Sequence, residues 1–269
     1  MVAAQRAIFE EVGGIDARTV YEGVGEGGDR SLVIDRRCED AVFAELEALG
    51  REGASFVAIS EERGEVSFGS GGPALVVIDP IDGSLNARRT IPSHSLSVAV
   101  ASGPSMADVE LGYVYDFGAG EELFARRGGG ATLRRGGGAT LDREPIRVAE
   151  DRDQLEILGV EAAEPKRALP TLEALAGSVY RLRVVGSIAI SAAYVAAGRF
   201  DGMLSLRPCR SVDAAAAQLI VREAGGLVAF GDLPLDEAPL HLDARYPIAA
   251  ACGEHALATI RAALPQNQI

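Results

Sequence analysis

The sequence predicts a mixed α/β protein, in which an α+β half over residues 1–150 precedes an α/β half over residues 151–269. The first half contains short apolar runs bounded by acidic or glycine-rich residues, a pattern typical of strands in a hairpin-rich sheet. In the second half strands and helices alternate, which indicates an α/β layer. Of the 269 residues, 48% are hydrophobic and 24% are charged. The chain is therefore long enough to bury a sizeable core and lacks the composition of a disordered protein.

The elements of the first half follow from apolar spacing and from glycine. The first twelve or so residues have the pattern of an amphipathic helix, which Gly13 and Gly14 end. A glycine-rich loop separates this helix from a short apolar stretch and from a second helix that ends at Gly50. The expected loop is 23–28, the apolar stretch 31–34, the helix 38–49, and the strands 56–59, 74–78, 96–101 and 109–114.

The second half is expected to begin with a polar segment. Residues 151–180 are polar with helical character, and we expect the boundary between the halves to lie among them. Helices are predicted over 187–197 and 213–224, with a strand over 202–206 between them. A pair of glycines closes the last of these helices.

Residues 126–133 and 134–141 form a tandem repeat, with Arg-Arg-Gly-Gly-Gly-Ala-Thr-Leu written twice. One copy is typical of a hairpin turn, so the second indicates a duplicated surface loop. Arg/Gly-rich tracts also occur in RNA-binding segments. This tract contains no aromatic residue that could stack on a base, and it lies in an acidic chain. We therefore favour the surface loop over RNA binding.

The charge and the cysteines narrow the partners and the compartment. The formal net charge of −13 argues against nucleic acid or an anionic membrane as partner, because both need a basic surface. A small anionic substrate stays compatible, because bound divalent cations reverse the local charge. Cys38, Cys209 and Cys252 form no Cys-x-x-Cys pair, so neither a disulfide framework nor a zinc site is predicted. With no signal-peptide pattern and no membrane-length apolar run, the expected location is cytoplasmic.

Asp79-Pro-Ile-Asp-Gly-Ser84 is the most informative stretch of the sequence. Five apolar residues lead to Asp79 at the end of a predicted strand, and Pro80 is expected to stop that strand because proline donates no ladder hydrogen bond. The carboxylates of Asp79 and Asp82 would then point into one small space, where a shared divalent cation removes their repulsion. Hard oxygen ligands of this kind favour Mg²⁺.

The end of the same stretch has the chemistry of a phosphate site. Gly83 lets a ligand approach the backbone, and Ser84 offers a hydroxyl and an N–H at what would be the start of a helix. An Asp-Pro turn followed by a helix cap is an ordinary alternative. For the hexapeptide alone the two interpretations are balanced.

Two further acidic sites shift that balance. Ser60-Glu61-Glu62 follows another apolar strand, and Asp213 opens a predicted helix. Taken singly, the first is compatible with a solvated loop and the second with an N-cap. Three acidic sites at strand ends and helix starts in one chain make a joint metal site the better interpretation.

The segments 60–62, 79–84 and 212–226 resemble the three signature segments of the inositol monophosphatase and fructose-1,6-bisphosphatase superfamily, in the family's order. Further similar segments are 31–35, 111–131, 183–187 and 194–198, so the resemblance covers most of residues 1–230. It is strongest to the archaeal-type, dual-specificity branch. The resemblance implies a layered α-β-α-β-α sandwich and, from the family, a homodimer.

The resemblance also implies roles for particular residues. Glu61, Asp79 and the Ile81 carbonyl would hold one Mg²⁺, and Asp79, Asp82 and Asp213 a second. A third Mg²⁺ near Glu61 stays open, as does Mn²⁺ as an alternative ion. Ser84, hydrogen-bonded to Asp35, would orient or deprotonate the metal-activated water that attacks phosphorus in line, with Glu61 assisting. The implied substrate-binding residues are Asp82, Gly83, Ser84, Gly186, Ser187 and Ile188, with Arg183, Arg207 and Arg210 as candidates for a second phosphate.

The expected function is a Mg²⁺-dependent phosphatase for a small sugar or inositol phosphate, with inositol 1-phosphate and fructose 1,6-bisphosphate both open as substrates. A phosphatase for adenosine 3′,5′-bisphosphate or another nucleotide-type phosphate is one alternative. A catalytically silent, metal-dependent binding or regulatory protein on the same fold is another. Gly23-Val-Gly25-Glu-Gly-Gly28 matches a dinucleotide-binding motif, but it lacks the preceding apolar strand and the following helix.

Overall fold

The computed structural model describes residues 1–24, 26, 30–136 and 143–264. The helices are α1 (Val2–Glu11), α2 (Ile15–Arg18), α3 (Val33–Arg51), α4 (Ser84–Arg88), α5 (Pro165–Leu175), α6 (Ile188–Ala196), α7 (Ser211–Glu223) and α8 (Glu254–Ala263). The strands are β1 (Tyr21–Val24), β2 (Arg30–Leu32), β3 (Phe56–Ser60), β4 (Gly64–Phe68), β5 (Leu75–Asp82), β6 (Ser95–Ala101), β7 (Val109–Asp116), β8 (Glu121–Arg126), β9 (Gly130–Arg135), β10 (Glu144–Ile146), β11 (Leu155–Glu161), β12 (Val179–Arg183), β13 (Gly202–Ser205), β14 (Cys209–Arg210), β15 (Leu227–Ala229), β16 (Arg245–Tyr246) and β17 (Ala249–Ala251).

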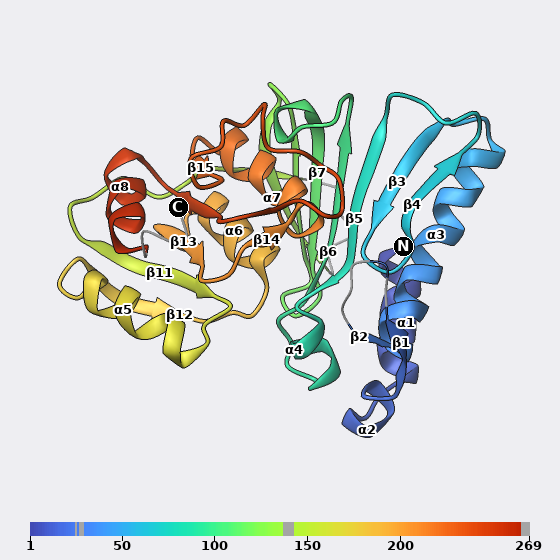
Figure 1. Cartoon of the computed structure of the whole chain (residues 1–269), viewed down its shortest axis with the longest axis horizontal. Coiled ribbons are helices and arrows are strands. Elements are labelled where there is room, and N and C mark those ends of the chain that lie inside the picture. The colour runs from blue at the N-terminus through green and yellow to red at the C-terminus, as the bar shows by residue number, and fades with distance from the viewer. Residues whose placement is uncertain (25, 27–29, 137–142, 265–269) are drawn as a thin grey trace.

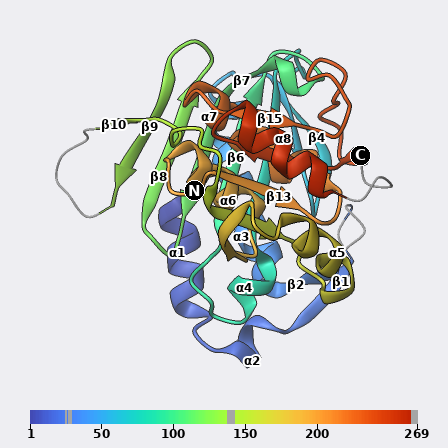
Figure 2. The same ribbon diagram turned by 90° about the vertical axis from the view of Figure 1, so that its left-hand side faces the viewer.

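Helices and two large sheets alternate in layers (Figure 1). The eight-stranded sheet has the order β10-β9-β8-β7-β6-β5-β3-β4, and the five-stranded sheet the order β12-β11-β13-β17-β15. The pair α1 and α3 covers the outer face of the first sheet, α6 and α7 lie between the sheets, and α8, with α5 packed on it, covers the second sheet. Figure 2 shows α5 and α8 from the front, with β8, β9 and β10 extending to one side. The expected α-β-α-β-α sandwich is confirmed.

The central helix α7 is buried along most of its length. Every residue from Ser211 to Val221 is buried, and the run Ala214–Ala217 presents only methyl groups to its neighbours. Gly112 of β7 faces this run, and a Cβ at that position would lie 2.5 Å from the carbonyl oxygen of Ala216. Small residues on both sides therefore let the helix approach the sheet closely, which fixes the position of its first turn.

Pro80 does not end its strand, contrary to the expectation from the sequence. β5 runs on to Asp82, and its pairing with β6 shifts register between Asp79, which faces Ser97, and Asp82, which faces Ser95. Between these two pairs β5 advances by three residues and β6 by two, and the extra residue on β5 defines a β-bulge. A bulge tolerates proline because a residue within it need not donate to the ladder.

Two further expectations need correction. Residues 151–180 are not mainly helical, because β11 lies among them and occupies the inside of the second sheet. Helix α7 begins at Ser211, so Asp213 is its third residue rather than its first. For β11, pairing with strands on both sides overrides local polarity.

The other expected elements of regular structure are confirmed, with shifts of a few residues at their ends. In the tandem repeat, residues 127–129 of the first copy join β8 to β9, while 137–141 of the second lie outside the described residues. Of the glycine-rich loop, residues 25 and 27–28 also lie outside them. Among the described helices, none has the length and apolarity needed to cross a membrane.

Candidate active site

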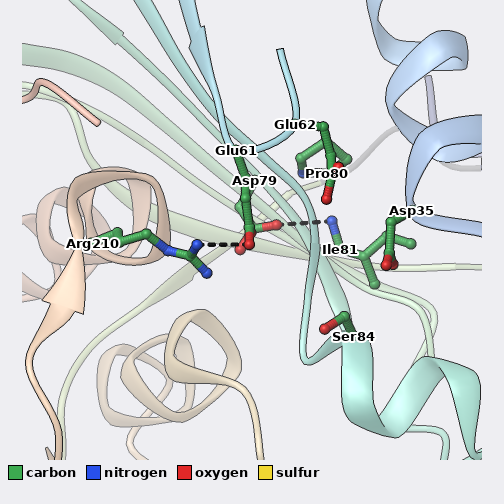
Figure 3. A pocket seen from close by; sticks show the side chains of 8 residues that line it. All are labelled: Asp35, Glu61, Glu62, Asp79, Pro80, Ile81, Ser84 and Arg210. Carbon is green, nitrogen blue, oxygen red and sulfur yellow. Dashed lines mark hydrogen bonds and ion pairs between the residues drawn. The ribbon is translucent and has the colours of Figure 1, made fainter. Parts of the chain in front are cut away.

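An acidic pocket of about 110 Å³ lies where α3, β3, β5, α4 and β14 meet (Figure 3). Its lining is mostly polar, with carboxylates from three separate parts of the chain. The residues that line it are Asp35, Glu61, Glu62, Asp79, Pro80, Ile81, Ser84 and Arg210.

The β-bulge in β5 shapes the floor of the pocket. Asp79 Oδ1 accepts a hydrogen bond of 2.9 Å from the N–H of Ile81, two residues on, so the backbone curls around this carboxylate. Asp79 and Asp82 are only 3% and 7% exposed. Burial, and then the neighbouring charges of Asp82 and Glu61, raise the pKa of Asp79 well above its usual value. The charges of the two carboxylates thus interact, as the pKa shifts of both indicate, but only Asp79 lines the pocket.

The carboxylate of Asp82 contacts the amino end of α6. Its Oδ2 accepts a hydrogen bond from the hydroxyl of Ser187 and another, of 2.7 Å, from the N–H of Ala189. Burial raises the pKa of Asp82 to about 7, with a further increase from the charge of Asp213 and a decrease from the Ser187 hydrogen bond. Ser187 is the N-cap of α6, so this carboxylate links β5 to the second half of the chain.

Arg210 brings a positive charge into the acidic cluster (Figure 3). Its Nη1 lies 2.6 Å from Oε1 of Glu61, and its Nε lies 3.8 Å from Oδ1 of Asp213. The backbone N–H of Arg210 also donates to Oδ2 of Asp213, at 2.8 Å, and so caps α7. The structure thus brings Glu61 and Asp213 to one guanidinium group.

Asp35 and Glu62 form the opposite wall of the pocket. Asp35 Oδ2 accepts the N–H of Leu32 at 3.2 Å, while its Oδ1 is buried with no hydrogen-bond partner. Glu62 Oε2 is likewise buried without a partner. Burial is the main reason why the pKa of Asp35 rises to about 6. The hydrogen bond expected between Ser84 and Asp35 is not formed among the described atoms, although Oδ1 of Asp35 has no other partner.

The donor set fits a hard divalent cation. All the candidate ligands are oxygen atoms, two carboxylate oxygens at the wall have no partner, and burial of several like charges favours a compensating cation. Within 1–24, 26, 30–136 and 143–264, however, no three Asp, Glu, His or Cys side chains converge as a ready metal cage. Arg210 is instead the cation that contacts Glu61.

A second, open cavity of about 410 Å³ begins where α4 continues beyond Ser84, and two of the remaining candidate residues line it. Arg207 and Gly186 line it, and Arg207 forms an exposed ion pair of 2.9 Å with Glu164. Arg183 lines neither cavity, and its Nη1 donates to the carbonyl oxygen of Leu182 at 2.8 Å. Ile188 is the first residue of α6.

Sequence reasoning missed Glu161, Asn86 and Glu39. Glu161 ends β11 and Asn86 lies in α4, and both hold the chain beside Gly186. Glu39 accepts a hydrogen bond from Ser60, next to Glu61. A signal for Glu161 was present, because Ile157-Leu-Gly-Val-Glu161 repeats the pattern of an apolar run that ends in a carboxylate.

Fold and pocket together define a class of protein: a layered α/β protein whose acidic pocket suits a divalent cation beside an anionic ligand. The sequence profile of the inositol monophosphatase family matches residues 2–268. The chain therefore belongs to the inositol monophosphatase family, as its sequence motifs predicted. Members of this family are phosphoric monoester hydrolases, and the family is generally metal-dependent.

Individual relatives agree with this assignment. The fructose-1,6-bisphosphatase/inositol-1-monophosphatase of Methanothermobacter thermautotrophicus is 34% identical over 234 residues, covering 83% of this chain and 79% of that protein. A bifunctional NADP phosphatase/NAD kinase of Methanococcus maripaludis is 28% identical over 250 residues, covering 87% of this chain and 42% of that protein. A crystal structure titled inositol monophosphatase-fructose 1,6 bisphosphatase matches with a TM-score of 0.81 at 26% identity, covering 98% of this chain and 96% of that one.

Proposed function

We propose that this protein is a Mg²⁺-dependent phosphomonoesterase that hydrolyses a small sugar or inositol phosphate, with inositol 1-phosphate and fructose 1,6-bisphosphate as its substrates. The observation that carries the proposal is the β-bulge of β5, which buries Asp79 in the pocket with Glu61, where the charges of Asp82 and Asp213 also act on it. Family membership supports the reaction class, and the first relative described above supports the substrates.

Two Mg²⁺ ions are proposed for the pocket, with Mn²⁺ as a substitute. Glu61, Asp79 and the Ile81 carbonyl would hold one ion, and Asp79, Asp82 and Asp213 the other. A third ion, near Glu61, would find unpartnered oxygens on Asp35 and Glu62. Bound divalent cations supply positive charge that neutralises the phosphate, and they lower the pKa of water.

The side chains around the pocket have complementary tasks in this proposal. The hydroxyl and N–H of Ser84 donate hydrogen bonds to phosphate oxygens, and Gly83 leaves room for the phosphate at the backbone. Oδ1 of Asp35, unpartnered and with the pKa of its carboxyl raised to about 6, is suited to accept a proton from the attacking water. The Arg210 guanidinium adds a positive charge at the rim, where it can contact phosphate oxygens.

The body of the substrate would extend from the acidic pocket into the neighbouring open cavity. The two cavities share α4, since Ser84 lines the first and Leu85 and Asn86 line the second. Gly186, Ser187 and Ile188 would contact the sugar or inositol ring. Arg207 would bind a second phosphate there, with Arg183 farther out along β12.

A nucleotide-type phosphate is the second candidate substrate. The relative named as a bifunctional NADP phosphatase/NAD kinase favours it, because the matched segment covers most of this chain. The open cavity beside α4 would then hold the nucleoside. A catalytically silent, metal-dependent binding or regulatory protein stays the alternative from another class.

Three further features belong to the proposal. A homodimer would cover the edge strand β12, on which Tyr180 and Leu182 are exposed large hydrophobic residues, as is Val184 directly after it. Residues 1–150 and 151–269 would act as two halves with the site between them. Cytoplasmic action would suit the three cysteines, all of them buried and free.

The experiment that tests the function measures phosphate release from inositol phosphates, fructose 1,6-bisphosphate, adenosine 3′,5′-bisphosphate and NADP, with Mg²⁺ and with EDTA. We expect Mg²⁺-dependent release from inositol 1-phosphate and fructose 1,6-bisphosphate. A preference for adenosine 3′,5′-bisphosphate or NADP would mean that the substrate is a nucleotide-type phosphate rather than a sugar or inositol phosphate. Release that persists in EDTA, or no release from any ester by a folded protein, would contradict the proposal.

A further inference from the structure

Outside the acidic pocket, a buried carboxylate accepts hydrogen bonds from the backbone segment that leads to the partners of Asp82. Glu161, the last residue of β11, is 1% exposed and lines neither of the two cavities near the site. Its Oε2 accepts the N–H of Gly186 at 2.6 Å, and its Oε1 accepts the N–H of Val185 at 3.2 Å. The hydroxyl of Ser191 donates to Oε1 as well. Glu161 therefore binds successive backbone amides of the 185–187 linker between β12 and α6.

The same linker is fixed from its opposite side by α4. Asn86 Nδ2 donates to the carbonyl oxygen of Val185 at 2.8 Å and to that of Ser93 at 2.7 Å. Gly186 has φ of +81°, and a Cβ there would lie 2.6 Å from Nδ2 of Asn86. The linker thus passes through a narrow gap in a left-handed conformation that favours glycine.

The linker leads into the two groups that orient Asp82, one at its last residue and one in the first turn of α6. Ser187 is its last residue, and the hydroxyl of Ser187 and the N–H of Ala189 both donate to Oδ2 of Asp82. Because both donors reach the same oxygen, they set the rotation of the carboxylate about its side-chain bond. A shift of the linker would move both donors together, so the direction of Asp82 depends on the position of residues 185–187.

We propose that Glu161 is a positioning residue for the metal site, acting through the 185–187 linker to hold Asp82 in the orientation that binds a divalent cation. The inference rests on the proposed phosphatase function and deepens it. A buried carboxylate suits this task because it accepts several hydrogen bonds at once, and charge-assisted bonds are stronger than neutral ones. The partners that orient a metal ligand commonly affect metal affinity even though they never touch the ion.

The first test compares Mn²⁺ binding by the wild type, Glu161→Gln and Glu156→Gln, using electron paramagnetic resonance of the free ion without substrate. Glu156 is an exposed residue of the same strand, so its variant controls for the loss of one negative charge from β11. We expect Glu161→Gln to weaken the Kd for Mn²⁺ by about tenfold, and Glu156→Gln to leave it unchanged. An equal Kd in all three proteins would overturn the positioning role.

A second comparison separates positioning from stability. Ser191→Ala removes one hydrogen bond to Glu161 but keeps both bonds from Glu161 to the linker, so we expect a lower Tm and a wild-type Kd for Mn²⁺. If Glu161→Gln does not fold, Glu161→Asp is used, because it keeps the charge but withdraws it by one methylene from the amides. A wild-type Kd in a folded Glu161→Asp, or an equal loss of Mn²⁺ affinity in Ser191→Ala, would contradict the proposal.

The same proteins distinguish failure of this inference from failure of the proposed function. Phosphate release is measured alongside as a function of Mg²⁺ concentration, and we expect Glu161→Gln to need about tenfold more Mg²⁺ for half-maximal rate. A wild type that binds Mn²⁺ but releases no phosphate would refute the phosphatase while the Kd comparison still decides the role of Glu161. A wild type that binds no Mn²⁺ would overturn both.

Discussion

Arg210 and Glu61 form an ion pair inside the acidic pocket, with 2.6 Å between Nη1 and Oε1. Both side chains are largely buried, so the pair is less screened by solvent than one on the surface. A divalent cation that uses Glu61 as a ligand has to compete with this guanidinium for the same carboxylate. In the proposed function Arg210 would thereby connect metal affinity with substrate affinity.

The first prediction concerns that competition. Arg210→Ala is expected to bind Mn²⁺ several-fold more tightly than the wild type without substrate, because Glu61 loses its internal counter-ion. The same variant is expected to have a higher KM for phosphate esters. Titration with Mn²⁺ and steady-state kinetics measure the two effects. Arg245→Ala, in the strand paired with β14, is the control for loss of one positive charge. Weaker Mn²⁺ binding by Arg210→Ala would contradict the competition.

Asp82→Asn is expected to fold normally and to lose nearly all turnover. The amide oxygen can still accept the hydrogen bonds of Ser187 and Ala189, but the negative charge at the metal site is gone. We expect kcat to fall by at least about 100-fold, with a far-UV circular dichroism spectrum and a Tm close to those of the wild type. Wild-type turnover would show that the two-metal assignment is wrong.

Arg207 and Arg183 are expected to differ in their effect on a bisphosphate. Arg207 lines the open cavity beside Gly186, whereas the guanidinium of Arg183 contacts the backbone of Leu182. Arg207→Ala should therefore raise KM for fructose 1,6-bisphosphate more than KM for inositol 1-phosphate, and Arg183→Ala should have a smaller effect. Kinetics with both substrates test this order. If a variant raises KM equally for both substrates, the arginine that it lacks does not bind a second phosphate.

Gly83→Ala should damage both stability and catalysis. Gly83 has φ of +89°, and its Cβ would lie 2.9 Å from the carbonyl oxygen of Ser93 and 3.0 Å from that of Gly186. Gly177 has φ of +90° with nothing within 4 Å of its Cβ, so Gly177→Ala measures the conformational cost alone, about 1–2 kcal/mol. Urea unfolding should show a larger loss for Gly83→Ala, and its kcat should also fall. Equal losses of stability would mean that the close contacts do not matter.

The pH dependence of stability has one expected source in Glu39. Burial raises the pKa of Glu39 to about 7, against its usual 4.5, and Ser60 partly offsets this increase. Because the folded pKa lies above the unfolded one, the contribution is full below pH 4.5 and is lost as pH rises through 7. Glu39→Gln should therefore gain stability relative to the wild type between pH 5 and 8, by up to about 3 kcal/mol.

The free energy of unfolding of Glu39→Gln and of the wild type is measured by urea unfolding in EDTA at pH 5 and at pH 8. Glu47→Gln serves as the control, because Glu47 is an exposed residue of the same helix α3. We expect the control to follow the wild type at each pH. A constant difference between Glu39→Gln and the wild type across this range would mean that Glu39 titrates as an ordinary carboxyl.

The acidic motifs at the strand ends were predictable because they are local. An apolar strand that ends in a carboxylate is visible in the sequence around Asp79 and around Glu61, and the structure brings both side chains into one pocket. The confirmed strands and helices share this property, since their spacing of apolar residues reflects which face is buried. The layered sandwich followed from family resemblance rather than from that spacing.

The features that sequence reasoning missed depend on contacts between distant segments. The bulge at Pro80 depends on how β5 pairs with β6, and the burial of β11 depends on strands that come later in the chain. The contact of Arg210 with Glu61 and the hydrogen bonds of Glu161 join residues far apart in sequence. No local pattern encodes these distances, so they became visible only with the chain folded.

The close packing of α7 has a consequence for how such a protein can change in evolution. With the carbonyl of Ala216 pressed toward Gly112, the helix that carries Asp213 has no room to slide or to accept larger side chains. The frame of the acidic pocket is therefore rigid and intolerant of substitution, while the open cavity beside α4 is bounded by exposed residues such as Arg207 and Val184. With the roles proposed for these two cavities, new substrates would be acquired by exchanging surface side chains around an unchanged acidic pocket.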